Sequence, residues 1–310
     1  MTPKTDSRGV ALVIVLWLLA LMAGLAAAVA ATARTETHLA RNLVEEARAR
    51  QLAQAGIYHA IVRLFQDQRD LLTLPPDGST VASVGIGGRQ VRYVIRDECG
   101  KIDLNTGRGG LILGLILANG VEDRRATSIA QAILDWRDPD HRVRARGAED
   151  REYKDAGLAY GARDGLFESI EELQQVLGIG PALYRRLAPD ITVNCLDAGV
   201  EPLAASPTVL AAIPNVDPIE VEAFLRARRA ARQDEAAGEP PSLAGGGRYV
   251  EGSAGQVYAI SAMAETPNGA RVRWEAVVWL TGDRKHPYAI RRWQRVPTAP
   301  LEAGAGGEVE

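Results

Sequence analysis

The hydropathy pattern begins with a long apolar run near the N-terminus. Val10–Ala33 contains 24 residues and no Asp, Glu, Lys or Arg, and about 20 apolar residues are enough for a helix to cross a bilayer. Lys4 and Arg8 precede the run, so the positive-inside rule predicts a cytoplasmic N-terminus and an extracytoplasmic body. A cleavable export signal has a shorter apolar core of about 7–15 residues. We therefore predict a single membrane span, and cleavage near Ala33 is the alternative.

The apolar run continues into an amphipathic helical pattern. No Pro or Gly occurs between Ala26 and Gln54, and the stretch is rich in helix-forming residues. Ala55, Tyr58 and Val62 recur at helical spacing, with charged residues on the opposite face. We predict one helix over residues 10–68, about 85 Å long at about 1.5 Å per residue. An anchor followed by an unrelated helix is the alternative.

Alternating apolar and polar residues predict an antiparallel sheet in two separate parts of the chain. Residues 80–98 contain two β-branched runs around Gly87-Gly88, which is a tight-turn signal. Residues 256–280 repeat this pattern around Asn268-Gly269, and residues 288–296 supply a further strand. We expect about five strands in all.

The sequence between the two sheet halves has the period and composition of helices. The predicted fold class is therefore α+β, with a large all-α domain inserted into a pilin-like antiparallel sheet. The predicted segments are a leader (1–9), a transmembrane half-helix (10–33), an amphipathic half-helix (34–68), the sheet (78–104 and 249–297), the inserted α-domain (105–235), a flexible linker (236–248) and a disordered tail (298–310).

Composition excludes few functions. The formal net charge of -3 gives no global electrostatic reason to bind nucleic acid. The four histidines are scattered without a metal-ligand spacing, and neither G-x-S-x-G nor a P-loop occurs. Cys99 and Cys195 lie far apart without a C-x-x-C, which argues against a zinc ribbon or a thioredoxin-type site. They could form a disulfide if the body is exported and would be free thiols in the cytosol.

The densest group of carboxylates lies in residues 135–155, where Pro139 and Gly147 predict turns. Calcium takes about six to eight oxygen ligands and favours such flexible loops. The EF-hand spacing is absent, and a solvated acidic loop balanced by arginines explains the stretch equally well. The candidate ligands are Asp138, Asp140, Glu149 and Asp150.

Residues 173–187 resemble a helix-hairpin-helix, whose Gly-Ile-Gly turn can offer N–H groups to a DNA phosphate. Arg185 and Arg186 follow the turn, but Glu168, Glu171 and Glu172 precede it. A phosphate-binding protein needs a basic face, so a connection between packed helices is the favoured interpretation.

The basic leader, apolar helix and amphipathic helix together resemble the N-terminus of type IV prepilins. In that class a prepilin peptidase cuts after the Gly that ends the leader, and the new N-terminus is methylated. The resemblance implies a cut between Gly9 and Val10. Most members carry Glu at the fifth mature position, where this chain has Ile14. Its absence is characteristic of the K-type minor pseudopilins of type II secretion systems, which this chain resembles.

Internal segments extend this resemblance over nearly the whole chain. The phrases "DECGKIDLNT", "ILDWRDPD", "GAED" and "SIEELQQVLGI" are similar to recurring segments of K-type pseudopilins. The resemblance implies a structural calcium site in the insertion, which favours calcium over the solvated loop. In the oxidising periplasm, a Cys99–Cys195 disulfide would join the entry of the α-domain to its middle.

The function implied by the resemblance is that of a non-enzymatic subunit of the type II secretion system. It would cap the periplasmic pseudopilus and help to initiate it while folded proteins cross the outer membrane. Its expected location is the bacterial inner membrane, and no nucleic acid is expected to bind. The expected partners are other minor pseudopilins, the prepilin peptidase and secreted cargo proteins. The alternatives are a membrane-anchored periplasmic DNA receptor that uses the helix-hairpin-helix, and a metal-dependent periplasmic hydrolase.

Overall fold

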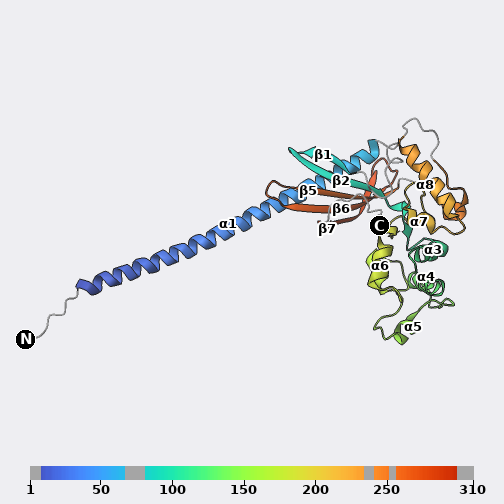
Figure 1. The fold of residues 1–310 in the computed structure, drawn as a ribbon, viewed down its shortest axis with the longest axis horizontal. Helices are drawn as coiled ribbons and strands as arrows, with labels where there is room; N and C mark the ends of the chain where they lie inside the picture. The colour runs from blue at the N-terminus through green and yellow to red at the C-terminus, as the bar shows by residue number, and fades with distance from the viewer. Residues whose placement is uncertain (1–7, 67–80, 234–240, 251–255, 299–310) are drawn as a thin grey trace, which may run out of the picture.

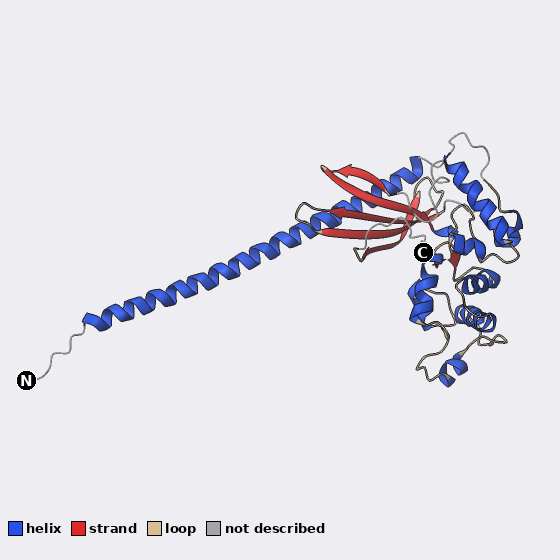
Figure 2. Cartoon of the chain, viewed as in Figure 1, coloured by secondary structure: helices blue, strands red, loops and turns tan. Residues whose placement is uncertain are grey.

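The structure is a computed structural model that describes residues 8–66, 81–233, 241–250 and 256–298. A 59-residue helix, α1 (Arg8–Gln66), extends far beyond the rest of the chain, and only its second half packs on a sheet (Figure 1). A helical unit lies at the end of the sheet that is remote from the N-terminus, so strands and helices separate along the molecule (Figure 2).

The sheet contains five antiparallel strands in the order β1-β2-β5-β6-β7. The β1–β2 hairpin turns at Gly87-Gly88, and the β5–β6 hairpin turns at Asn268-Gly269, as the sequence predicts. The strands are β1 (Ala82–Ile86), β2 (Arg89–Asp97), β5 (Val257–Glu265), β6 (Arg271–Leu280) and β7 (Tyr288–Val296).

Helix α1 covers one face of this sheet through a stripe of small and branched side chains. Ala53, Ile57 and Leu64 are fully buried against alternate residues of β2, β5 and β6. Gly56 marks the closest approach, because a Cβ added there would lie 2.6 Å from Val91 Cγ1. Glycine therefore allows the helix to approach the strands more closely than a larger residue would.

The helical unit is an insertion between two neighbouring strands. Asp97 at the end of β2 pairs with Tyr258 at the start of β5, so the chain leaves the sheet and returns to it at the same place. The elements of the insertion are η1 (Glu98–Gly100), β3 (Ile102–Asp103), α3 (Gly109–Ala118), α4 (Asp123–Arg137), α5 (Asp150–Asp155), η2 (Ile170–Gln175), α6 (Pro181–Leu187), η3 (Ala188–Asp190), β4 (Ile191–Thr192), α7 (Pro207–Ala211), α8 (Pro218–Gln233) and η4 (Ala244–Tyr249).

The inserted unit has its own hydrophobic core, and this core extends beyond the predicted limits of 105–235. Ile102 and Leu104 precede those limits, and Leu243 follows them. Part of the predicted linker, 236–248, is therefore wrong. Leu243 is buried, and the backbone N–H of Gly245 donates to Glu220, so this part of the segment packs on the α-unit. The predicted tail, 298–310, lies outside the described residues except for Thr298.

A disulfide joins Cys99 to Cys195 at the junction of the sheet and the insertion. Both sulfurs pack with Val257 and Val277 of the sheet. A second contact between the units is a hydrogen bond of 3.0 Å from Arg291 Nη1 on β7 to the carbonyl oxygen of Asn194. The junction therefore combines covalent, apolar and polar contacts.

Candidate functional site

The acidic stretch forms a loop between α4 and α5. Helix α4 ends before Asp138, whose extended backbone is the conformation that the following Pro139 favours. Helix α5 begins with Glu149 at its N-cap, and the backbone N–H of Glu149 donates to Glu152 Oε2 at 3.0 Å. The two helix ends thus fix the backbone positions of Asp138 and Glu149.

Asp135 and Arg144 hold the loop in shape. Asp135 is fully buried and accepts hydrogen bonds from the backbone N–H groups of Arg144, at 3.2 Å, and Ala148, at 2.8 Å. The Arg144 guanidinium donates to both Asp135 and Asp138. Asp135 is therefore satisfied by the protein, and one oxygen of Asp138 remains available.

Three carboxylates on and near this loop have buried oxygens that lack hydrogen-bond partners. These buried oxygens are Asp138 Oδ1, both side-chain oxygens of Glu149, and Asp164 Oδ1. One ligand atom each from His141, Glu149 and Asp164 lie within 4.8 Å of one another. Burying several acceptors without a donor is costly, and a cation or protons among these oxygens would reduce that cost.

The electrostatics of Glu149 agree with this interpretation. Burial raises the pKa of Glu149 to about 7, and the neighbouring negative charges of Asp135, Asp164 and Asp138 add to the effect, while His141 opposes it. The same charges that disfavour ionisation of Glu149 would stabilise a bound divalent cation.

The four sequence-predicted ligands divide into two pairs. Glu149 belongs to the group with His141 and Asp164. Asp138 lies outside that group, but it has a buried oxygen without a partner, and its charge raises the pKa of Glu149. Asp140 is exposed and accepts from the backbone N–H of Arg142 at 2.8 Å, and Asp150 is exposed on the first turn of α5. Neither belongs to the cluster among the described residues. Sequence reasoning missed Asp164, although its place before Gly165 indicates a turn, and the structure gives it a positive φ of 54°.

The donor set fits calcium. Carboxylate oxygens on a flexible loop are the ligands that calcium prefers, and Asp138, Glu149 and Asp164 offer them. His141 is exposed, and its Nδ1 lies 3.2 Å from Asp164 Oδ2. Because imidazole suits zinc or other transition metals, His141 is the residue that distinguishes the two classes of ion.

The Gly-Ile-Gly turn serves packing between helices. A Cβ on Gly178 would lie 2.9 Å from Ile129 of α4, and its φ is +91°. Ile179 is buried in the core of the α-unit. Arg185 and Arg186 are exposed on α6, and exposed Glu171 lies before the turn. The close contact of Gly178 with Ile129 and the burial of Ile179 agree with the predicted role of this turn in helix packing.

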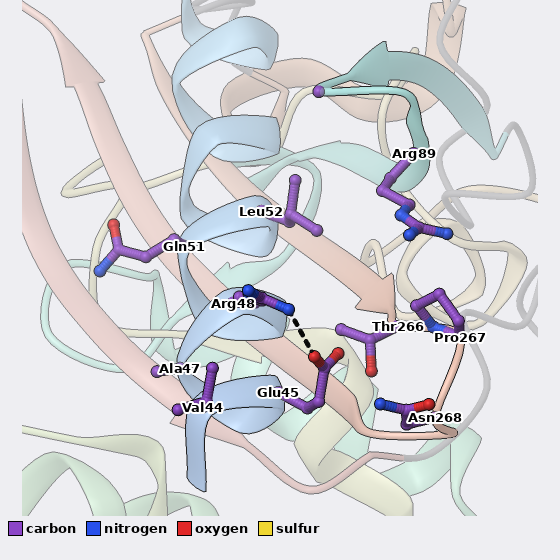
Figure 3. Close-up of a pocket in the computed structure, with 11 residues that line it drawn as sticks. Val44, Glu45, Ala47, Arg48, Gln51, Leu52, Arg89, Thr266, Pro267 and Asn268 are labelled. Carbon is purple, nitrogen blue, oxygen red and sulfur yellow. Dashed lines mark hydrogen bonds and ion pairs between the residues drawn. The ribbon is translucent and has the colours of Figure 1, made fainter. Parts of the chain in front are cut away.

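A groove lies where α1 leaves the sheet (Figure 3). One wall is α1, and the other is formed by the tips of the β1–β2 and β5–β6 hairpins; the groove has a volume of about 800 Å³. Arg48 donates to Glu45 at 2.6 Å on the helix wall, and Arg89, Thr266 and Asn268 come from the hairpin tips (Figure 3).

The N-terminal half of α1 is long and apolar enough to cross a membrane. The predicted processing residues, Gly9 and Val10, lie in the first turn of this helix. Ile14 is about half exposed, as are the apolar residues around it.

Comparison with known proteins finds one family of similar sequences. Residues 106–194, which include the carboxylate cluster, match the sequence model described as type II secretion system (T2SS), protein K. Type II secretion system protein K of Pectobacterium carotovorum subsp. carotovorum is 32% identical over 214 residues, 63% of this chain and 65% of that protein. The chain is similar to the protein K family of type II secretion systems.

Other relatives and a solved structure agree with this similarity. Type II secretion system protein K of Pseudomonas aeruginosa is 30% identical over 155 residues, 46% of this chain and 45% of that protein. The matches therefore span less than two thirds of these protein K relatives. A chain in the crystal structure of the GspK-GspI-GspJ complex from enterotoxigenic Escherichia coli shares the fold, with a TM-score of 0.56 and 18% identity, over 81% of this chain and 99% of that chain.

Proposed function

We propose that this chain is a minor pseudopilin of a type II secretion system, anchored in the inner membrane with its body in the periplasm. The observation that carries the proposal is α1, which joins an apolar half of membrane-spanning length to a half packed on the sheet. Such a helix can hold a subunit in the membrane and later insert into a helical filament. The body at its end is bulky, which suits a terminal position where no further subunit follows.

The proposed partners are the other minor pseudopilins of the same system. The structural relative is part of a GspK-GspI-GspJ complex, and a comparable complex is expected here. Co-purification of the full-length chain in detergent with the other minor pseudopilins tests this. Loss of secretion on deletion, restored by the wild-type chain, supports the role in export. Normal secretion without the chain, and no co-purification, would contradict it.

Maturation by the prepilin peptidase is the second part of the proposal. A cut between Gly9 and Val10 would leave the apolar helix in place and put Ile14 at the fifth mature position. Mass spectrometry of the purified protein is expected to find Val10 at the N-terminus, methylated. A mature protein that begins near residue 34 would refute the proposal, because it would lack the membrane half of α1.

Calcium binding by the carboxylate cluster is the third part. Asp138, Glu149 and Asp164 would hold the ion, which would neutralise charges that the fold has gathered and desolvated. The ion would therefore stabilise the loop between α4 and α5. This role is structural, so calcium is expected to change thermal stability.

A further inference from the structure

The exposed part of α1 between the apolar run and the sheet carries a second pattern, in addition to its sheet-facing stripe. Successive positions separated by three and four residues form the seam of a coiled coil. Starting from the first charged residue after the apolar run, this spacing selects Arg34, Thr37, Arg41, Val44, Arg48 and Gln51. Every second position of this seam is arginine.

The three arginines lie on one side of the helix. Seven residues advance an α-helix by nearly two turns, so Arg34, Arg41 and Arg48 fall within roughly 40° of one another around the axis. Arg34 and Arg41 are exposed and make no ion pair within the described part of the chain, whereas Arg48 pairs with Glu45 of its own helix. The seam is therefore basic.

The seam leads into the groove below the hairpin tips. A hollow of about 540 Å³ follows α1 and shares residues with the 800 Å³ groove; its lining includes Thr37, Arg41, Val44, Arg48 and the acidic Glu45, which pairs with Arg48. Asn268 lines both spaces (Figure 3). Thr266, at the wall of the groove, is 5% exposed and its hydroxyl has no hydrogen-bond partner.

We propose that this basic seam docks a parallel helix of another minor pseudopilin that carries Asp or Glu at seven-residue intervals. The inference rests on the proposed function and adds the chemistry of the partner. Acidic residues at the facing positions neutralise Arg34 and Arg41, and the end of the docked helix reaches the groove below the hairpin tips. A second copy of this chain, aligned in parallel and in register, would place arginine against arginine. Like charges at a coiled-coil seam oppose association, so the seam selects a different subunit.

A helix explains this surface better than an anionic lipid does. Arg34 follows the apolar run directly, but Arg48 lies about 21 Å further along the helix axis at about 1.5 Å per residue. The field of a charged membrane surface falls off within a Debye length of about 8 Å at physiological ionic strength. A lipid headgroup at the membrane surface can reach Arg34, but it cannot also neutralise Arg41 and Arg48.

The test uses the full-length chain co-expressed with the other minor pseudopilins and purified in detergent. The variant Arg34→Glu/Arg41→Glu is expected to weaken hetero-association roughly tenfold, because two favourable charge pairs become repulsive. Arg125→Glu is the matched control, since Arg125 is exposed on α4 and far from α1. Cross-linking from Val44→Cys identifies the facing helix, and replacing its acidic residues with arginine is expected to restore binding to the double variant.

A second arm uses this chain alone. Mixing the wild-type chain with Arg34→Glu/Arg41→Glu is expected to give a heterodimer more readily than either chain gives a homodimer, because only the mixture places opposite charges across the seam. Equal hetero-association of the wild-type and double-variant chains would overturn the inference while leaving the proposed function intact. Dependence on anionic lipid alone, or an equal effect of Arg125→Glu, would also overturn it. Absence of any complex with the wild-type chain would instead contradict the proposed function.

Discussion

Glu149 is the residue at which the proposed calcium site is most directly tested. Calcium is expected to raise the thermal midpoint of the full-length protein. At a calcium concentration of about 100 times the Kd, binding would add about 2.7 kcal/mol to the free energy of unfolding. Glu149→Gln and Asp164→Asn should lose this rise because they remove cluster oxygens, and Asp140→Asn and Asp150→Asn should keep it. Differential scanning fluorimetry with and without calcium measures both. His141→Ala serves as the control for ion class: it should spare calcium and weaken any response to zinc.

The metal-free protein is expected to depend on pH through the same residue. The pKa of Glu149 rises from 4.5 to about 7 on folding, so between these values the folded protein holds a proton that the unfolded chain has released. The free energy of unfolding should therefore fall as pH increases from about 4.5 to about 7. Chemical denaturation in a chelator, compared with Glu149→Gln, measures the effect. The variant should lose this part of the slope, and Asp150→Asn, which alters an exposed carboxylate, should retain it.

Sequence reasoning named two of the three carboxylates that have buried oxygens without partners. Asp138 and Glu149 lie in one acidic stretch, and such a concentration of acidic residues can be recognised from the sequence alone. Asp164 is isolated in sequence and joins them only because the chain returns past α4. Asp140 and Asp150 have the right chemistry and the right neighbourhood, but the loop turns them toward solvent. The presence of carboxylates in this region is therefore predictable from the sequence, whereas the direction in which each side chain points depends on the path of the loop.

At the scale of the elements, the junction of α1 with the sheet depends on Gly56. Gly56→Val should lower stability by about 1–3 kcal/mol, because its side chain would overlap Val91 on β2 and force the helix away from the sheet. Thermal unfolding of the full-length protein in detergent measures this. Gly24→Val is the matched control on the same helix, since nothing lies within 4 Å of a Cβ there. Equal midpoints for both variants would show that the close approach is unimportant.

Helices and hairpins were the predictable elements. The pattern predicted one helix over residues 10–68, and α1 spans 8–66; both glycine-containing hairpin turns also occur as predicted. The short parallel pair β3 and β4 was missed, because two residues carry no period and their partners lie almost ninety residues apart. Leu243 was missed for a similar reason: a lone leucine among glycines gives no pattern, although tertiary contacts bury it.

At the scale of the whole molecule, the disulfide lies at the junction of the two units. Cys99 follows the last residues of β2, and Cys195 follows β4, so the bond closes a loop with a sequence separation of 96 residues. In the chain-entropy model a loop of this size contributes about 4–5 kcal/mol as an upper estimate. The double variant Cys99→Ala/Cys195→Ala should therefore unfold at a markedly lower denaturant concentration than the wild type.

Reduction offers an independent route to the same state. A thiol reductant should destabilise the wild-type chain by a similar amount and should leave the double variant unchanged, because the variant has no bond to lose. The hydrogen bond between Arg291 and Asn194 tests how far the disulfide sets the orientation of the α-unit relative to the sheet. If the disulfide fixes the α-unit against the sheet, Arg291→Ala should lower the free energy of unfolding more in the double variant than in the wild type. The reason is that in the wild type the covalent link already holds the two partners together. Equal costs in the two backgrounds would show that each contact acts alone, and that the units would keep their arrangement without the covalent bond.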